Sequence, residues 1–183
     1  LARALAAGVP GNKITFSGVG KTAAEIREAL AVNIFCFNVE SEPELEAISK
    51  IAVQMGKQAN ISLRVNPDVD ARTHAKISTG RAENKFGVAL SQARTVYARA
   101  AKLPGLRVTG VDMHIGSQLT EVKPYELAVK KMLPLAQKLA ARHGFEFFSI
   151  GGGLGIIYNP ALASSDAQWW QSAAAKDIQI GRA

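Results

Sequence analysis

Two short stretches, His114-Ile-Gly-Ser-Gln118 and Gly151-Gly-Gly-Leu-Gly155, decide the fold and the site that we predict for this chain. The first follows Val111-Asp-Met113 and the second follows Phe147-Phe-Ser-Ile150, and both runs are typical of buried strands. The stretches therefore place an imidazole, a hydroxyl and a bare glycine backbone where strands end. Because backbone N–H groups can approach an anion where side chains are missing, this combination suits a flat aromatic cofactor with a phosphate. Chemically it indicates pyridoxal phosphate.

The composition is that of a soluble globular domain. The chain has 183 residues, with 48% hydrophobic and 20% charged residues, which fits one domain. No apolar run approaches the roughly 18 residues of a membrane helix, so we expect no membrane partner. The formal charge is +7, but the basic residues are scattered rather than clustered. We therefore expect no nucleic-acid partner, whereas a positive field suits anionic small molecules.

Cysteine and histidine usage narrows the chemistry further. Cys36 is the single cysteine, so the sequence excludes an internal disulfide and fits a reducing, cytoplasmic compartment. Its apolar neighbours predict a buried structural thiol. The three histidines are far apart in the sequence, so no metal site is predicted.

Strand-like and helix-like segments alternate along the chain. Apolar, β-branched runs predict strands at residues 13–17, 34–39, 61–65, 111–115 and 147–150. Helical periodicity predicts helices at residues 21–31, 41–55, 91–103 and 124–143. This alternation indicates an α/β fold with a parallel sheet of about five βα units. The pattern alone fits either a barrel or a doubly wound sheet.

Together, several motifs resemble the diaminopimelate decarboxylase family, fold-type III pyridoxal-phosphate enzymes related to ornithine decarboxylase and alanine racemase. The resemblance covers residues 1 to about 160. The motifs that carry it are Leu63-Arg-Val-Asn-Pro-Asp-Val69, Thr73-His74, Ser78-Thr-Gly80, Lys85-Phe-Gly87, His114-Ile-Gly-Ser-Gln118 and Gly151-Gly-Gly-Leu-Gly155. The resemblance implies a TIM-like (β/α)8 barrel, whose catalytic groups lie at the carboxyl ends of the strands. It therefore favours the barrel over the doubly wound sheet.

The resemblance also implies roles for individual residues. His114 matches the catalytic histidine that stacks on the pyridine ring, and Ser117 matches a hydrogen-bond donor to the phosphate. The remaining cofactor-binding residues that it implies are Gly151, Gly152 and Gly153 in the phosphate loop and Arg64 at a strand end.

Some segments of the family pattern have no counterpart in this sequence. We find neither the strand with the Schiff-base lysine nor the Glu-Pro-Gly-Arg segment that supplies a carboxylate to the pyridine nitrogen. We therefore expect residues 1–183 to form a partial barrel domain, without the N-terminal strands and the C-terminal β domain, and to be inactive alone. Because a barrel needs about eight strands to close, an incomplete one leaves unpaired edges. The alternative is a phosphate-binding barrel that has lost catalysis.

For the intact enzyme the resemblance implies a carboxy-lyase that converts meso-2,6-diaminopimelate to L-lysine with pyridoxal phosphate. A related arginine- or ornithine-type decarboxylase is the alternative. The surroundings of Asn66-Pro-Asp-Val69 and Thr79-Gly80 favour diaminopimelate. The expected partners are an amino-acid substrate and, for the full-length protein, a second subunit in a homodimer.

Overall fold

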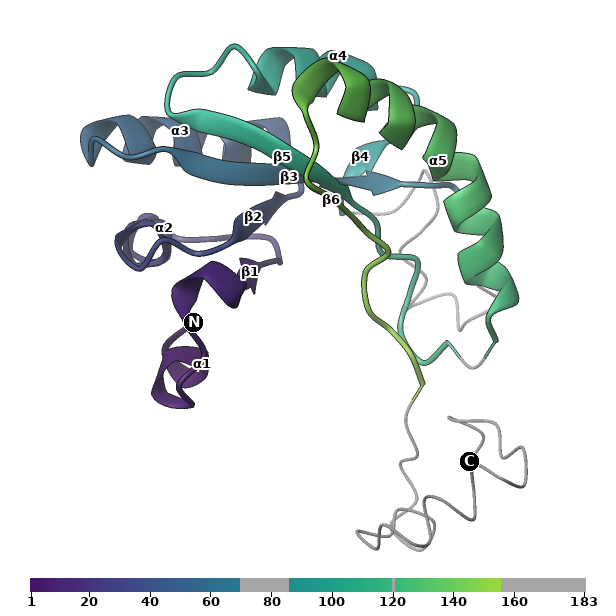
Figure 1. Ribbon diagram of the computed structural model, residues 1–183, viewed down its shortest axis with the longest axis horizontal. Helices are drawn as coiled ribbons and strands as arrows, with labels where there is room; N and C mark the ends of the chain where they lie inside the picture. The colour runs from purple at the N-terminus through teal and green to yellow at the C-terminus, as the bar shows by residue number, and fades with distance from the viewer. Residues whose placement is uncertain (70–85, 120, 156–183) are drawn as a thin grey trace, which may run out of the picture.

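The computed structural model describes residues 1–69, 86–119 and 121–155 as a curled α/β structure (Figure 1). Its sheet has the strand order β1-β2-β3-β5-β6, and β4 pairs with β3 beyond this path. The strands are β1 (Thr15–Phe16), β2 (Cys36–Val39), β3 (Ala59–Asn66), β4 (Val88–Ala89), β5 (Leu106–Asp112) and β6 (Phe147–Ser149). The helices are α1 (Ala2–Ala6), the 3-10 turn η1 (Gly11–Lys13), α2 (Ala23–Ala31), α3 (Glu42–Gln54), α4 (Ala93–Ala100) and α5 (Lys123–His143).

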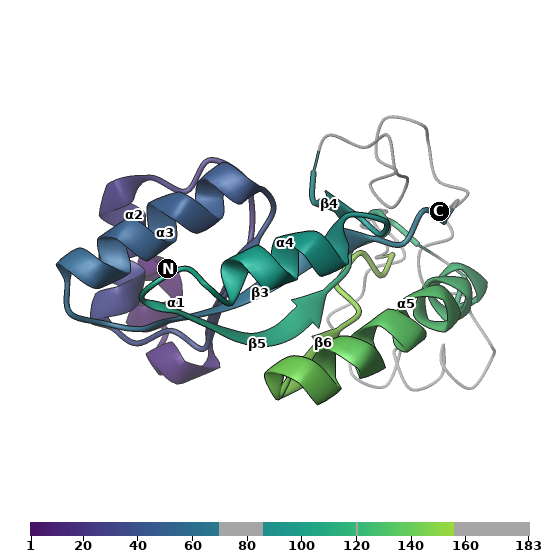
Figure 2. The ribbon, with the colours of Figure 1, turned by 90° about the horizontal axis from the view of Figure 1, so that it is seen from above.

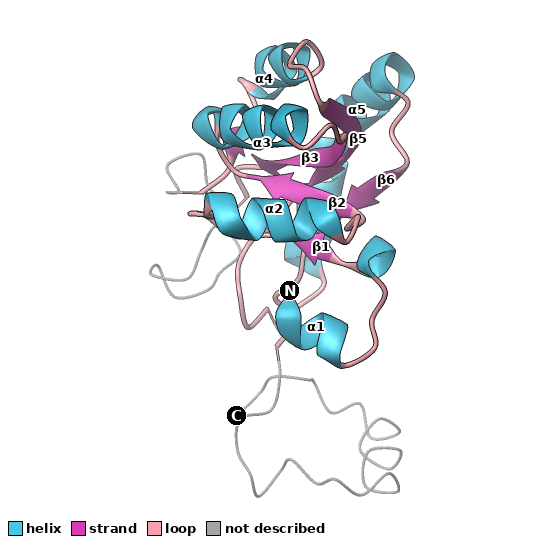
Figure 3. Ribbon diagram, turned by 90° about the vertical axis from the view of Figure 1, so that its left-hand side faces the viewer, coloured by secondary structure: helices cyan, strands magenta, loops and turns pink. Residues whose placement is uncertain are grey.

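Every pair of neighbouring strands is parallel. Helices α3, α4 and α5 form an arc over the outer face of the sheet, and α2 lies beside α3 (Figures 1 and 2). Seen from the side, the sheet lies within this layer of helices (Figure 3). Because parallel strands need crossover connections, each helix returns the chain to the same starting edge. The predicted fold class, a partial parallel α/β barrel, is confirmed.

Local sequence signals explain where the helices begin and end. The Thr22 hydroxyl and the Glu25 carboxylate form a reciprocal capping box at the start of α2. The Ser41 hydroxyl caps α3, and Pro43 lies in its first turn. Helix α5 ends at Gly144, whose φ of 68° places it in the left-handed region that glycine adopts readily.

Strand β3 is the centre of the hydrophobic core. Its residues Ile61, Leu63 and Val65 are fully buried and pack in one cluster with the residues of α3 and α4. The alternate residues Asn60, Ser62 and Arg64 are polar. Since successive side chains on a strand point to opposite faces, β3 presents an apolar face to the helices and a polar face to the inside of the curl.

Several predicted boundaries were wrong. The fourth predicted strand, 111–115, begins at residue 106 and ends at residue 112, and the short strand β4 was not predicted. Helix α4 spans residues 93–100 rather than 91–103. The boundary was wrong because an apolar run indicates burial rather than strand structure. Residues 113 and 115 are buried without belonging to the strand. Two motifs of the resemblance, Thr73-His74 and Ser78-Thr-Gly80, and the first residue of a third, Lys85, lie outside the described residues. In the described ranges, no helix is long and apolar enough to cross a bilayer.

Shortening Ile61 to alanine tests the central position of β3. Ile61 is fully buried, so Ile61→Ala is expected to lower the free energy of unfolding by about 2–5 kcal/mol through lost burial and a residual cavity. Val53→Ala on α3 is the matched control, because Val53 is 52% exposed and its loss is expected to cost less than about 0.5 kcal/mol. Urea denaturation measures both values. Equal losses in the two variants would contradict this assignment of the core.

Candidate cofactor site

A cavity of about 550 Å³ lies at the carboxyl ends of the strands. This volume is within the range of ordinary small-molecule sites. Its lining comes from the ends of five strands and the loops after them. The lining residues are Thr15, Ser17, Gly18, Asn38, Glu40, Arg64, Asp112, His114, Ser149, Gly151 and Gly152.

The floor of the cavity holds an ion pair with very little access to solvent. Arg64 Nη1 donates to Glu40 Oε2 over 3.1 Å, and Glu40 Oε1 accepts the backbone N–H of Gly18 over 3.1 Å. The Glu40 side chain is 1% exposed and that of Arg64 is 12% exposed. Arg64 Nε is buried and has no hydrogen-bond partner among the described residues. A buried guanidinium N–H without a partner is costly, so this atom is a donor suited to a bound polar ligand.

Asp112 faces Arg64 across the sheet, because the two residues are partners in the β3–β5 register. Burial raises the pKa of Asp112 to about 6, opposed by a hydrogen bond from Ser149 and by the charge of Arg64. Burial and the charge of Arg64 both lower the pKa of His114. At neutral pH the site therefore presents a neutral imidazole beside a buried cluster of two carboxylates and one guanidinium.

The glycine turn after β6 has no room for side chains at two of its positions. A Cβ on Gly151 would lie 2.2 Å from the carbonyl oxygen of Met113, and a Cβ on Gly153 would lie 1.8 Å from that of Gly116. Both residues have positive φ, 78° and 95°. At Gly152, by contrast, an added Cβ would meet nothing within 4 Å. The turn thus packs its outer residues against the 113–116 backbone and leaves Gly152 facing open space.

Hydrogen bonds hold the glycine turn beside the histidine loop. Leu119 N donates to Gly153 O over 2.8 Å, and Gly155 N donates to Leu119 O over 3.0 Å. Tyr125, on α5, donates its hydroxyl to Gly152 O over 2.8 Å. The backbone N–H of Gly152 lies 3.4 Å from His114 Nδ1. The histidine segment 114–118 and the glycine turn 151–155 are therefore neighbours in space.

The structure brings together most of the predicted site residues. His114, Arg64, Gly151 and Gly152 line the cavity, and Gly153 lies in the same turn, behind it. Ser117 is exposed and is not among the lining residues, so the structure does not bring it to the cavity. Its role as a phosphate donor, like the roles of the others, stays a prediction.

Sequence reasoning missed the acidic groups of the cavity, Glu40 and Asp112. Each is a carboxylate at or just after the carboxyl end of a strand whose other residues are mostly apolar, and that position was the available signal. Asn38 was also missed. Its amide donates to Ser17 Oγ over 2.8 Å and accepts from Ser62 Oγ over 2.7 Å, which joins β2 to β3 and to the loop after β1.

Lys21 is a buried lysine near the site, but its ammonium is fully engaged. Nζ donates to Gly18 O, to Asn38 O and to the carboxylate of Glu44. Three donors meet three acceptors, so this amine is not free for covalent chemistry. We assign Lys21 a structural role between the β1 loop and α3.

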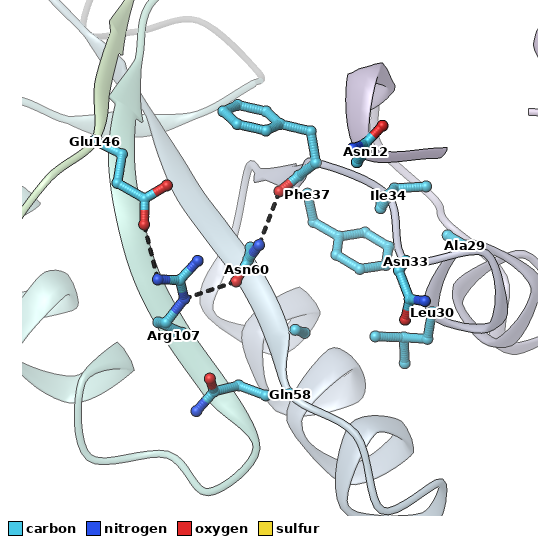
Figure 4. A pocket seen from close by; sticks show the side chains of 12 residues that line it. Asn12, Ala29, Leu30, Asn33, Ile34, Phe37, Gln58, Asn60, Arg107 and Glu146 are labelled. Carbon is cyan, nitrogen blue, oxygen red and sulfur yellow. Dashed lines mark hydrogen bonds and ion pairs between the residues drawn. The ribbon is translucent and has the colours of Figure 1, made fainter. Parts of the chain in front are cut away.

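A second cavity of about 350 Å³ lies at the opposite edge, by the amino ends of the strands (Figure 4). There Arg107 lies between Asn60 and Glu146, with bonds of 2.9 and 2.7 Å (Figure 4). The amino-terminal edge of a barrel usually serves stability rather than chemistry. The carboxyl-edge cavity is therefore the candidate functional site.

The carboxyl-edge cavity fits pyridoxal phosphate on three observations. The glycine turn exposes backbone at Gly152, the buried Nε of Arg64 offers a donor, and His114 lines the same cavity. A phosphate suits a glycine turn, a polar ring substituent suits a guanidinium, and a flat ring suits an imidazole face.

Residues 1–179 match the family model described as "Pyridoxal-dependent decarboxylase, pyridoxal binding domain". The chain belongs to this family. The resemblance inferred from the motifs is thereby confirmed, as is the cofactor class that it implied.

Relatives in the family are similar over most of this chain. It is 54% identical over 167 residues to diaminopimelate decarboxylase of Pseudomonas aeruginosa, covering 89% of this chain and 40% of that protein. It is 53% identical over 159 residues to the enzyme of Haemophilus influenzae, covering 86% and 38%. This chain therefore spans about 40% of the length of these relatives.

Solved structures of the family show the same fold. The crystal structure of diaminopimelate decarboxylase from Helicobacter pylori complexed with L-lysine superposes with a TM-score of 0.81 at 40% identity. That match covers 98% of this chain and 46% of the other. The arginine decarboxylase of Paramecium bursaria Chlorella virus has a TM-score of 0.69 at 23% identity, covering 98% and 46%, which shows the shared fold alone.

Replacing Asp112 by asparagine tests the buried carboxyl. Because the folded-state pKa of Asp112, about 6, lies above its ordinary value of 3.8, the protonated form stabilises the fold. This contribution is present at low pH and is lost as the pH rises through about 6. Asp112→Asn is therefore expected to gain stability relative to the unchanged protein as the pH rises from about 4 to about 6, and to keep that gain above pH 6, by up to about 3 kcal/mol. Urea denaturation across this range measures the difference, and a difference independent of pH would contradict the burial of Asp112.

Proposed function

We propose that the protein containing this chain binds pyridoxal phosphate at the carboxyl-edge cavity and decarboxylates meso-2,6-diaminopimelate to L-lysine. The observation that carries this proposal is the convergence of His114, Arg64 and the glycine turn on one cavity. The identity of about half the residues to enzymes named diaminopimelate decarboxylase supports the choice of substrate.

In this proposal the chain holds and orients the cofactor. The phosphate would lie against the backbone of the glycine turn at Gly152, where no side chain intervenes, and would take over the N–H groups of Gly151 and Gly152 from Ser149 Oγ and His114 Nδ1. The imidazole of His114 lies against the ring and fixes its plane. Arg64, held by Glu40, directs its unpaired Nε–H toward a polar substituent of the ring. The cofactor, when bound, supplies the electron sink that accepts the pair left as carbon dioxide departs.

The neutral state of His114 matters for this arrangement. Burial and Arg64 keep the pKa of His114 low, so the imidazole adds no positive charge against the ring. A neutral imidazole can stack on a cationic pyridine without repulsion. The surrounding carboxylates of Glu40 and Asp112 offset the charge of Arg64 on the floor of the cavity.

We further propose that residues 1–183 form part of a cofactor-binding barrel domain, acting in the cytoplasm as part of a homodimer. Coverage of about 40% of the relatives supports a larger whole. Among the described strands, β1 and β6 each pair on one edge only, so each has an edge available for a further strand. The single buried thiol of Cys36, whose pKa burial raises to about 11, suits a reducing compartment.

Carbon dioxide release by the full-length protein tests the reaction. With pyridoxal phosphate added, we expect release from meso-2,6-diaminopimelate and formation of L-lysine, with release from L-arginine lower by at least about a hundredfold. His114→Ala is expected to reduce the diaminopimelate rate at saturating cofactor. Faster turnover of arginine would make the protein an arginine-type decarboxylase, and cofactor binding without turnover of either would make it a binding barrel.

A methyl group at Gly152 tests the phosphate loop. Because an added Cβ meets nothing within 4 Å, Gly152→Ala is expected to fold with little loss of stability but to obstruct the approach of an anion. We expect its affinity for pyridoxal phosphate to fall by about tenfold or more, while its affinity for unphosphorylated pyridoxal changes little. Fluorescence titration measures both ligands. If both affinities fell equally, the phosphate would not lie at this turn. Lys50→Ala, on the outer side of α3, is the control.

A further inference from the structure

Strand β5 supplies one side chain to each of the two cavities, and these two side chains, Arg107 and Asp112, differ by an odd number of positions along the strand. Arg107 hydrogen-bonds to Asn60 at the amino edge (Figure 4), and Asp112 faces Arg64 at the carboxyl edge. Asn60 and Arg64 share one face of β3 because they are separated by an even number of residues. Arg107 and Asp112 are separated by an odd number, yet they also share that face. Regular alternation along β5 would put them on opposite faces.

A β-bulge in β5 resolves this conflict. The register runs from Ile61 opposite Val108 to Ser62 opposite Gly110, so Thr109 is an extra residue without a partner on β3. Such an insertion reverses the phase of every side chain that follows it. Before the bulge the odd-numbered residues of β5, such as Arg107, face inward. After it the even-numbered residues, such as Asp112, do so. His114, two residues further, lines the same cavity.

Without the extra residue, the side chains of β5 that follow it would face the opposite way, so that apolar residues would replace polar residues in the cavity. Val111 and Met113 are fully buried on the side of the helices. A regular strand would turn them into the cavity and would direct Asp112 and His114 into the hydrophobic layer. The bulge therefore sets which side chains at the end of β5 and just after it face the cavity.

Tyr97, on α4, spans the two strands directly beside this bulge. Its hydroxyl accepts the backbone N–H of Leu63 over 3.2 Å and donates to the carbonyl of Gly110 over 2.9 Å. Leu63 follows the register shift on β3, and Gly110 follows it on β5. Tyr97 is fully buried, and burial raises its pKa, so the hydroxyl remains a donor wherever the protein is folded. On the inner face, Thr109 Oγ1 donates to Ile61 O over 3.3 Å.

We infer that Tyr97 is a positioning residue for the cofactor site: its hydroxyl, from the outer helix layer, holds the β5 bulge that turns Asp112 and His114 into the cavity. This inference rests on the proposed function only where pyridoxal phosphate is the probe. Tyr97 contacts neither the cavity nor a reacting group, and it acts through the backbone of Gly110.

The test compares Tyr97→Phe with Val96→Ala in the full-length protein. Phenylalanine keeps the packing of the ring and removes the hydroxyl alone. Val96 is a buried neighbour on α4, so its truncation destabilises the same layer without touching the bulge. Two quantities are measured below the unfolding temperature: the NMR titration of the His114 imidazole, assigned with His114→Gln, and the dissociation constant for pyridoxal phosphate.

In Tyr97→Phe we expect the pKa of His114 to shift from its value in the unchanged protein, because the burial and the Arg64 charge that set it both change when the bulge is lost. We expect the pyridoxal-phosphate dissociation constant to increase by about tenfold, as a lost hydrogen bond allows. In Val96→Ala we expect both to match the unchanged protein. The inference is overturned if Tyr97→Phe leaves both unchanged, or if Val96→Ala shifts them equally. If the unchanged protein binds no pyridoxal phosphate, the proposed function fails, whereas the His114 titration still decides the inference.

A second variant serves if Tyr97→Phe does not fold. Thr109→Val retains the shape of the extra residue and removes its hydroxyl, which bonds to Ile61 O on the inner side of the same bulge. The same shift in the pKa of His114 is expected, by a smaller amount. An unchanged titration in this variant would show that the bulge does not depend on these hydroxyls.

Discussion

Strand β3 hydrogen-bonds to β2 along one edge and to β5 along the other, and all three run parallel. The rest of the structure depends on this pairing. It brings Glu40, Arg64 and Asp112, which lie at or near the carboxyl ends of three successive strands of the sheet, to one edge. There the attraction between Glu40 and Arg64 offsets part of the cost of burying both charges. The same pairing fixes the apolar face of β3 against α3 and α4, so the core and the site are two faces of one strand.

The site is made by backbone as much as by side chains. The glycine turn packs so closely on the 113–116 segment that Gly151 and Gly153 leave no space for a Cβ. This contact sets the turn beside His114, and Tyr125 fixes the carbonyl of Gly152 from α5. A phosphate would therefore meet a turn whose conformation is already set, which lowers the ordering cost of binding. The cavity and the family membership of the chain point to the same cofactor from independent observations.

Burial influences which side chains of the cavity carry a charge. Arg64 carries a positive charge and forms an ion pair with Glu40, while Asp112 lies opposite Arg64 with a raised pKa. His114 is kept neutral by the same surroundings. A cationic aromatic ring could enter such a site without facing a second cation. The outer helix layer takes part as well, because Tyr97 bonds to the strand backbone where the phase of β5 changes.

The sequence by itself determined the parallel α/β class, the helix start at Ser41, and the two motifs that identify the family, because these depend on local periodicity, local hydrogen bonds and residue type. It also placed His114, Arg64 and the glycines at strand ends. It could not find Glu40 or Asp112, since a carboxylate after a strand is usually solvated and only pairing across the sheet buries it. It could not predict which side chains of β5 face inward, because Thr109 is an ordinary strand residue by type and only the register with β3 leaves it unpaired. Only the tertiary structure, through that register and the hydroxyl of Tyr97, decided which side chains of β5 face the cavity.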